Sequence, residues 1–253
     1  MIKNIVFDMG KVLVNYDGMN VCRHHIADEK DREQVCTAVF ISPEWVLLDM
    51  GVIPEDQAMK QICGRLPERL HEAARLCMRD WHLYCMSTMR EMEPVVRGLK
   101  EHGYGIYLCS NASLRLRQCY RQVIPAVDCF DGILFSAEEK VMKPQKEIYE
   151  RLFEKYGLKP EECLFIDDLQ LNIDGAKACG MDGYCFADRD VERLKEELRK
   201  RLAGEEPTAQ AGEEPAAQAG GEPAAQAGEE PAVLTGTLSG AGSAEEKISG
   251  QVV

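Results

Sequence analysis

The sequence predicts an α/β fold in which a parallel β-sheet core carries an α-helical cap inserted after the first strand. Three observations support this prediction. Short apolar runs end in polar residues, helical patterns alternate with those runs, and a long stretch after the first run shows helical spacing alone. Of the 253 residues, 45% are hydrophobic and 29% are charged, a balance typical of a globular protein with a sizeable core.

Five short apolar runs are predicted to be buried strands. They cover residues 2–7, 105–109, 132–135, 163–166 and 183–186. Helical patterns fall between or after them, at residues 93–102, 114–123, 145–156, 172–179 and 190–202. Because strand and helix alternate, we expect an open, Rossmann-like parallel sheet with right-handed crossovers and helices on both faces.

Residues 17–92 are predicted to form the cap, because no convincing strand appears there. Apolar positions recur at helical spacing, as at Ala58, Ile62 and Leu66. Two Pro-Glu pairs, which begin at Pro43 and Pro54, have the chemistry of helix starts. An insertion after the first strand lies over the edge of the sheet where α/β folds bind ligands. The core would then comprise residues 1–16 and 93–202.

Residues 203–253 are predicted to be a disordered acidic tail. An octapeptide rich in Ala, Gly, Glu, Pro and Gln is repeated four times over residues 203–234 and has little to bury. The formal net charge is -13, and nine Glu and one Lys place -8 of it in this tail, which leaves -5 for the rest. A mildly acidic folded part argues against a nucleic-acid partner.

The composition also predicts a cytoplasmic protein without a membrane segment. No run approaches the roughly 18 to 20 apolar residues that a membrane span needs, and a secretory signal is not expected. The 11 cysteines are scattered singly, which fits a reducing compartment and a role as small apolar core residues. We expect a monomer or a homodimer.

Four segments place polar groups at the ends of predicted strands or at the start of a helix. Asp8 ends the first strand, Ser110 and Asn111 end the second, Lys143 precedes a helix, and Asp167-Asp168 ends the fourth. If the strands are parallel neighbours, all four groups converge at one edge of the sheet. Each group taken singly also has an ordinary structural explanation, as a helix cap, a turn residue or an exposed lysine.

Together, these segments resemble the four sequence motifs of the haloacid dehalogenase superfamily over residues 1–202. The resemblance implies that Asp8 is the nucleophile, that Ser110 and Lys143 are catalytic and bind phosphate, and that Asp167 and Asp168 form the acidic motif. It implies an Mg²⁺-dependent hydrolase with an aspartyl-phosphate intermediate. The substrate would be a small phosphorylated metabolite.

Elementary electrostatics supplies a physical reason for these implied roles. An anionic nucleophile approaches a phosphate ester only if cations neutralise the phosphoryl oxygens, and Mg²⁺ prefers oxygen ligands. Asp8, Asp167, Asp168 and the backbone carbonyl of Gly10 are the expected ligands. Ser110, the backbone N–H of Asn111 and Lys143 are expected to hold the remaining phosphoryl oxygens. Asn172 is expected to orient Lys143 or a metal-bound water.

The closest resemblance within the superfamily is to the bacterial α-D-glucose-1-phosphate phosphatases, which share the Asp-x-Gly opening and a helical cap. Gly10 occupies the position where most phosphatases of this superfamily carry a second aspartate that protonates the leaving oxygen. Losing such a group costs roughly 10² to 10⁴ in rate if nothing replaces it.

Three explanations for Gly10 remain open. In the first, Asp17, His24 or His25 takes the role. In the second, which the resemblance favours, the substrate has a leaving group that needs little help, such as the anomeric oxygen of glucose 1-phosphate. In the third, the protein is a catalytically weak phosphate-binding protein. A dehalogenase, which needs no metal, is a further alternative that the acidic pair argues against. Residues predicted to contact a sugar ring from the cap, or else to pack within it, are Trp45, Trp81, His82 and Tyr84.

Overall fold

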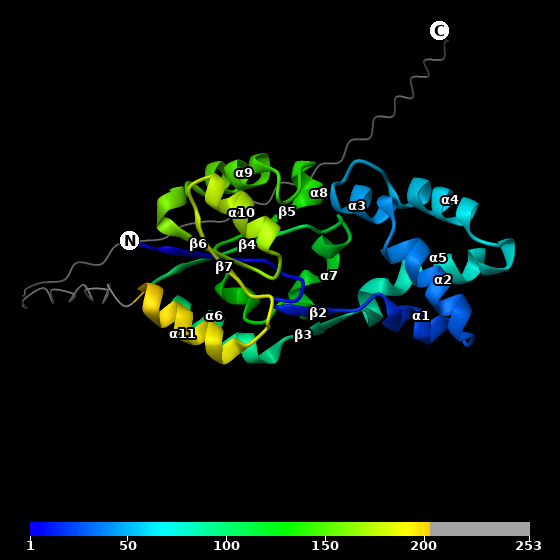
Figure 1. Cartoon of the computed structure of the whole chain (residues 1–253), viewed down its shortest axis with the longest axis horizontal. Coiled ribbons are helices and arrows are strands. Elements are labelled where there is room, and N and C mark those ends of the chain that lie inside the picture. Colours follow the sequence, from blue (N-terminus) through cyan, green and yellow to red (C-terminus); the bar gives the residue numbers. More distant parts are fainter. Residues whose placement is uncertain (203–253) are drawn as a thin grey trace, which may run out of the picture. The chain divides into compact units, whose positions relative to one another are not determined.

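A five-stranded parallel β-sheet forms the centre of the fold (Figure 1). The computed structural model describes residues 1–202, so the prediction for residues 203–253 lies outside the described chain. The strand order is β5-β4-β1-β6-β7. The bounds are β1 Asn4–Phe7, β4 Gly105–Ser110, β5 Gly132–Phe135, β6 Cys163–Asp167 and β7 Asp182–Cys185. The predicted parallel α/β sheet is confirmed, and every predicted strand end lies within two residues of the observed one.

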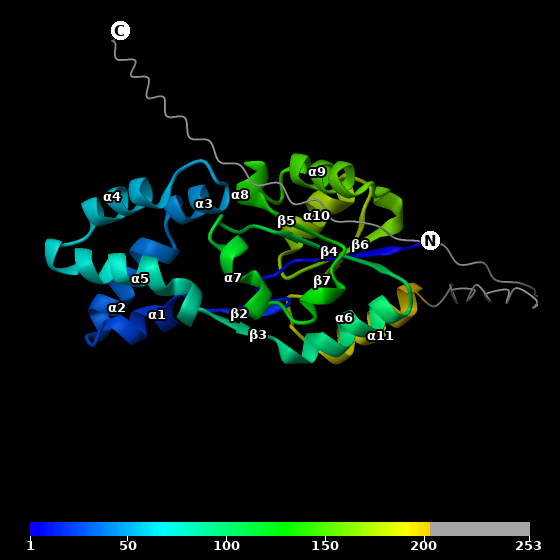
Figure 2. The same cartoon turned by 180° about the vertical axis from the view of Figure 1, so that it is seen from behind.

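Helices cover both faces of this sheet, because successive side chains of each strand point to opposite sides (Figures 1 and 2). Val6 and Phe165 pack in one apolar cluster with α9 (Lys146–Tyr156) and α10 (Gln170–Ala178). Ile5 and Phe7 pack in another with the remaining helices of the core. These are α6 Glu93–Glu101, α7 Leu116–Val123 and α11 Val191–Leu202. Burial on both faces explains the continuous apolar runs that predicted the strands.

Short elements complete the core. They are α8 Ser136–Glu139 and the 3₁₀ helices η2 Arg90–Met92, η3 Val127–Cys129 and η4 Pro160–Glu162. Among the described helices, none combines the length and the apolar character that a bilayer crossing needs.

Five helices lie between the first and second strands of the main sheet. They are α1 Met19–His25, α2 Glu29–Phe40, α3 Pro43–Asp49, α4 Glu55–Arg65 and α5 His71–Tyr84, with the 3₁₀ helix η1 Glu68–Leu70 before α5. The predicted helix starts are observed: the Ser42 side chain caps α3 by accepting a hydrogen bond from the Trp45 N–H at 3.2 Å, and α4 begins at Glu55 after Pro54. These helices and the sheet belong to one compact unit.

The chain enters and leaves these helices through a two-stranded antiparallel ribbon of β2 (Val14–Tyr16) and β3 (Met86–Thr88). The expectation that residues 17–92 contain no strand is therefore wrong at β3. A strand of three residues shows no period that a sequence could reveal, and its pairing with β2, 70 residues away, defines it. The ribbon fixes where the helical insertion begins and ends.

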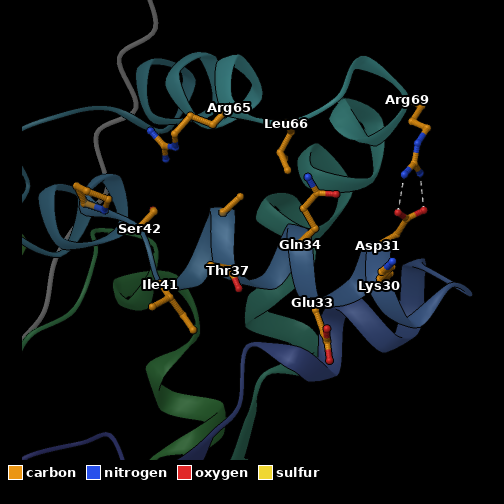
Figure 3. A pocket seen from close by; sticks show the side chains of 12 residues that line it. Lys30, Asp31, Glu33, Gln34, Thr37, Ile41, Ser42, Arg65, Leu66 and Arg69 are labelled. Atoms are coloured by element: carbon orange, nitrogen blue, oxygen red, sulfur yellow. Dashed lines mark hydrogen bonds and ion pairs between the residues drawn. The ribbon is translucent and has the colours of Figure 1, made fainter.

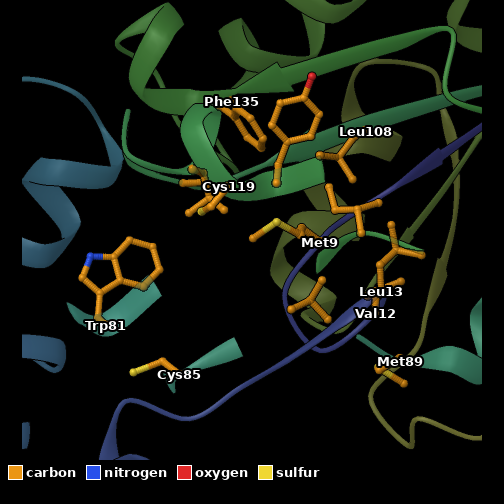
Figure 4. Packing of buried hydrophobic residues seen from close by; sticks show 14 of the residues in the cluster. Met9, Val12, Leu13, Trp81, Cys85, Met89, Leu108, Cys119 and Phe135 are labelled. Carbon is orange, nitrogen blue, oxygen red and sulfur yellow. The ribbon is translucent and has the colours of Figure 1, made fainter. Parts of the chain in front are cut away.

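Apolar packing continues from the sheet into the insertion (Figure 4). Leu108 and Phe135 of the sheet belong to the same buried cluster as Trp81 of α5 and Cys85 after it. A hydrogen bond also joins the core to the insertion at the junction between α8 and α3: the Ser136 hydroxyl of α8 donates to the backbone carbonyl of Asp49 at the end of α3.

Gly51 follows α3 and gives a test of this junction. Its φ of +70° favours glycine, and a Cβ there would collide with the backbone carbonyl of Ala137. Gly103 has φ of +86°, but a Cβ there would meet no atom within 4 Å. We expect Gly103→Ala to lower the free energy of unfolding by about 1 to 2 kcal/mol, the cost of the left-handed conformation.

Gly51→Ala should lower it further, because the collision forces α3 away from α8. Urea unfolding of the two variants measures the difference. Equal losses would show that the junction between α3 and α8 does not constrain the insertion.

Candidate functional site

Asp8 lies at the carboxyl edge of the sheet, between the ends of two neighbouring strands. Phe7 is in register with Ile166 on β6 and with Leu108 on β4, and the Asp8 N–H donates to the Ile166 carbonyl at 2.9 Å. Because the strands are parallel, Asp167 and Ser110 end at this same edge. The predicted convergence therefore arises from strand register.

The Lys143 ammonium bridges two of the predicted carboxylates. Its Nζ lies 2.7 Å from Oδ1 of Asp8 and 2.6 Å from Oδ2 of Asp167, and its side chain is only 1% exposed. Burial lowers the pKa of Lys143, but the charges of Asp8 and Asp167 outweigh burial and the pKa lies above its usual value. Lys143 therefore remains a fixed positive charge next to the Asp8 carboxylate.

Asp167 is held by the protein on both of its oxygens. Asn172 Nδ2 donates to Oδ1 at 2.9 Å and to Oδ2 at 3.0 Å, and the Leu169 N–H donates to Oδ1 at 2.9 Å. With Lys143, these contacts orient a carboxylate that has no solvent exposure. Asn172 was expected to orient Lys143 or a water, and the structure places its amide on Asp167 instead, so its effect on Lys143 is indirect.

Three carboxylates come together at this edge, and their oxygens suit a divalent cation. One ligand atom from each of Asp8, Asp167 and Asp168 lies within 4.8 Å of the others. Burial raises the pKa of Asp8 to about 6, although Lys143 opposes it, and burial and the neighbouring Asp167 raise the pKa of Asp168. A bound cation would offset the repulsion between these carboxylates, so the residues fit Mg²⁺.

Ser110 and Asn111 lie where the sequence predicted them. Ser110 ends β4, is 2% exposed and lines the cavity described below. The Asn111 side chain is engaged by the backbone of Lys143: its Oδ1 accepts from the Lys143 N–H at 2.8 Å, and its Nδ2 donates to the Lys143 carbonyl at 3.0 Å. The Asn111 side chain thus holds the lysine segment in place, and the proposed phosphate contact of its backbone N–H stays a prediction.

A cavity of about 250 Å³ opens above these residues, between the sheet edge and the helical insertion. Its polar wall on the sheet side consists of Asp8, Lys11, Ser110, Asn111, Lys143, Asp168 and Asn172. Its wall on the side of the insertion consists of Tyr16, Trp45, Asp49, Trp81 and Met86. The two tryptophan rings meet edge to face with their centroids 5.3 Å apart.

Several residues named from the sequence lie outside this cavity. Neither His82 nor Tyr84 lines it, and Tyr84 stacks on His24 with ring centroids 4.0 Å apart. His25 pairs with Asp80 at 2.9 Å. Asp17 instead accepts a hydrogen bond from the Met19 N–H at 2.8 Å near the start of α1. None of Asp17, His24 and His25 is therefore placed to protonate a leaving group in the cavity.

A larger hollow of about 670 Å³ lies on the insertion, against α2 and the segment after α4 (Figure 3). Two of its arginines are paired within the protein: Arg69 with Asp31, at 2.5 and 2.8 Å, and Arg65 with Glu44. Asp8, Asp168 and Lys143 line the other, smaller cavity, which is therefore the candidate site.

Three residues that line that cavity were not expected from the sequence. Asp49 and Tyr16 line it although neither belongs to a motif, and Met86 comes from the unpredicted strand β3. One signal was available for Asp49: it lies four residues after Trp45 on one helix, and residues at this spacing share a helix face. No sequence signal placed that face toward Asp8.

An open parallel sheet with an acidic cluster and a buried lysine at its carboxyl edge defines an enzyme of the Rossmann-like α/β class. The haloacid dehalogenase-like hydrolase family matches residues 2–180. The chain belongs to this family and is a hydrolase.

Known proteins agree with this assignment. A sesquiterpene phosphatase of Aspergillus oryzae is 27% identical over 186 residues, which cover 74% of this chain and 90% of that protein. A D-ribitol-5-phosphate phosphatase of Bacteroides thetaiotaomicron is 27% identical over 203 residues, covering 73% of this chain and 91% of the relative.

Solved structures share the fold. A haloacid dehalogenase family enzyme from Bacteroides thetaiotaomicron, in complex with magnesium and inorganic phosphate, superposes with a TM-score of 0.55 at 22% identity, over 73% of this chain and 94% of that one. L-2-haloacid dehalogenase from Xanthobacter autotrophicus gives a TM-score of 0.54 at 20% identity, over 79% and 83% of the two chains.

The acidic cluster predicts that Mg²⁺ stabilises the protein. At a free Mg²⁺ concentration 100 times the Kd, we expect the free energy of unfolding to rise by about 2.7 kcal/mol, because the folded state alone holds the ligands together. Asp168→Asn removes one anionic ligand and should abolish most of this gain. Thermal unfolding with and without Mg²⁺ measures it.

Asp174→Asn is the matched control, because Asp174 is exposed on α10 and bonds Gln170. Mg²⁺ should raise the free energy of unfolding of Asp174→Asn by the full amount. An undiminished gain in Asp168→Asn would show that Asp168 does not bind the ion.

Proposed function

We propose that this protein is an Mg²⁺-dependent phosphatase that attacks a phosphoryl group with the Asp8 carboxylate. The single observation that supports this is the cluster of Asp8, Lys143, Asp167 and Asp168 at the sheet edge, of which Asp8, Lys143 and Asp168 line the cavity. The product of the first step is an aspartyl phosphate, which water then hydrolyses.

The residues at the sheet edge bind the phosphoryl oxygens and offset the negative charge on them. Lys143 lies 2.7 Å from the nucleophile and remains positive, so it offsets charge on a phosphoryl oxygen that approaches Asp8. Ser110 and the backbone N–H of Asn111 donate to the other oxygens. When bound by Asp8, Asp167 and Asp168, Mg²⁺ would supply the positive charge that lets two anions meet.

Dehalogenation is the main alternative reaction. A displacement of halide from carbon needs no metal, yet three buried or half-buried carboxylates meet at this site. Without a cation they would repel the carboxylate of a haloacid. The two relatives named as phosphatases also favour phosphoryl transfer.

We propose a small phosphorylated metabolite as substrate, with a sugar phosphate such as glucose 1-phosphate as the first candidate. The anomeric oxygen of a sugar 1-phosphate is a better leaving group than an ordinary alcohol, which suits a site with Gly10 in place of an aspartate. Trp45 and Tyr16, which are partly exposed and line the cavity, offer aromatic contacts for a sugar ring. The relative that acts on D-ribitol 5-phosphate supports this class.

The same aromatic wall favours a second candidate, the phosphate ester of an apolar alcohol. Trp45, Trp81, Tyr16 and Met86 give the cavity a largely apolar wall opposite the nucleophile. Such a wall binds hydrocarbon as well as it binds a sugar face. The relative named as a sesquiterpene phosphatase supports this candidate.

We also propose that the protein works in the cytoplasm as a monomer or a homodimer. All 11 cysteines are free, and eight of them are buried, which supports a reducing compartment.

Replacement of Asp8 by Asn should lower kcat by about 10⁴-fold or more, because an amide cannot attack phosphorus. The assay is release of p-nitrophenolate from p-nitrophenyl phosphate with Mg²⁺. Asp17→Asn is the control, since Asp17 lies outside the cavity, and it should retain activity. EDTA should abolish turnover and added Mg²⁺ restore it.

Retained turnover in Asp8→Asn would contradict the mechanism. Indifference to EDTA together with halide release from 2-haloacids would favour dehalogenation. No turnover with p-nitrophenyl phosphate or any phosphorylated metabolite would favour a phosphate-binding role.

A substrate panel separates the two substrate candidates. We expect a higher kcat/KM for glucose 1-phosphate than for glucose 6-phosphate, because the anomeric oxygen leaves more readily. Phosphate release with these sugars and with farnesyl phosphate measures the preference. Equal or reversed rates for the two glucose phosphates would reject the sugar 1-phosphate, and a dominant rate with farnesyl phosphate would favour the apolar candidate.

A further inference from the structure

Even a good leaving oxygen departs faster when a neighbouring group protonates it, and Gly10 has no side chain to do so. The other charged groups of the cavity on the sheet side are already engaged. Lys143 is paired with Asp8 and Asp167, and Lys11 lies 3.6 Å from Asp168. A proton donor must therefore come from elsewhere in the cavity wall.

Asp49 is the one carboxyl group among the residues lining this cavity that lies outside the acidic cluster. It ends α3 on the wall opposite the sheet edge. The core holds it at two points: the backbone N–H of Ser113 donates to its carboxylate, and the Ser136 hydroxyl donates to its backbone carbonyl. Ser113 lies three residues after Ser110, so the loop that carries a proposed phosphate ligand also positions Asp49.

The surroundings of Asp49 keep its carboxyl group protonated at neutral pH. Burial raises the pKa of Asp49 to about 8, and the hydrogen bond from Ser113 opposes this rise. A proton donor near this value is well matched to catalysis at neutral pH. The charged groups that share the cavity are Asp8, Lys11, Lys143 and Asp168.

Tyr16 is the other titratable group on this wall, and its buried hydroxyl has no hydrogen-bond partner among the described residues. Burial, followed by Cys85 and Asp49, raises the pKa of Tyr16 above its usual value, which makes it a weaker acid than Asp49. Tyr16 is therefore a poorer proton donor than Asp49.

We propose that Asp49, supplied by the helical insertion, is the general acid and base of the reaction. This proposal rests on the proposed phosphatase function. An Asp8 oxygen attacks phosphorus, the bond from phosphorus to the leaving oxygen breaks, and that oxygen takes the electron pair and the Asp49 proton. Water then attacks the aspartyl phosphate and passes one proton to the Asp49 carboxylate, which releases inorganic phosphate and free Asp8.

The position of Asp49 depends on the packing of α3 against the core. The contacts of Asp49 with Ser113 and Ser136 form only when α3 lies against the core. Arg115 of the core also pairs with Glu55 of α4. The packing of α3 and α4 against the core therefore holds Asp49 on the cavity wall.

The test compares Asp49→Asn with the wild-type protein over aryl phosphates whose leaving groups range from good to poor. An amide keeps the acceptor for the Ser113 N–H but cannot give a proton. We expect kcat/KM of Asp49→Asn to fall about 10² to 10⁴-fold for phenyl phosphate and less than about threefold for p-nitrophenyl phosphate, whose leaving group needs no proton. Asp56→Asn, at an exposed carboxylate on α4, should match the wild-type protein.

Two further measurements distinguish proton transfer from a structural role. Hydrolysis of the aspartyl phosphate still needs a base, so Asp49→Asn should give a rapid burst of p-nitrophenolate followed by slow turnover. In the wild-type protein, kcat/KM for phenyl phosphate should fall as the pH rises through about 8 and Asp49 loses its proton. This alkaline fall should be absent in Asp49→Asn.

Equal losses of kcat/KM for every leaving group, without a burst, would show that Asp49 only positions α3 and would overturn the proposal. Unchanged kinetics in Asp49→Asn would overturn it as well. Both outcomes presuppose that the wild-type protein hydrolyses the aryl phosphates, so they do not contradict the proposed phosphatase function. An inactive wild-type protein would overturn both.

Discussion

The buried contact of Lys143 with Asp8 and Asp167 is the constraint on which the rest of the site depends. An ammonium with a 1% exposed side chain lies within 2.7 Å of both carboxylates, so removing either partner would leave an uncompensated charge in the interior. Asn111 holds the backbone of Lys143, and Asn172 holds Asp167. These contacts fix three segments that are far apart in the sequence and leave Asp8 facing the cavity beside a permanent positive charge.

The cavity has one charged wall and one aromatic wall, because the sheet edge forms the first and the helical insertion forms the second. The sheet edge supplies charge, because parallel strands end together and present the polar residues that follow them. The helical insertion supplies aromatic rings and Asp49, because its inner face also packs against the core. We propose that the phosphoryl chemistry depends on the first wall, and that substrate choice and proton transfer depend on the second.

Much of the fold and part of the site could be predicted, for identifiable reasons. Val6 and Phe165 lie in the uninterrupted apolar segments 5–7 and 163–166, as expected of strands buried on both faces, so β1 and β6 were evident. Met86–Thr88 could not be recognised, because three residues carry no period and pairing with β2 defines the strand. Asn172 was expected near Lys143 but bonds Asp167, and Asp17, His24 and His25 follow the first strand closely in sequence yet lie outside the cavity.

By itself, the sequence determined the parallel α/β core and the segments that carry Asp8, Ser110, Lys143 and Asp167-Asp168. Local apolar runs and the residues that end them are sufficient for this, since parallel neighbours must end at one edge. Only the tertiary structure decided which residues face Asp8 across the cavity. Asp49 lies 41 positions from Asp8, and it reaches the site because α3 docks on α8 and on the loop after Ser110, a contact between distant segments that no local pattern encodes.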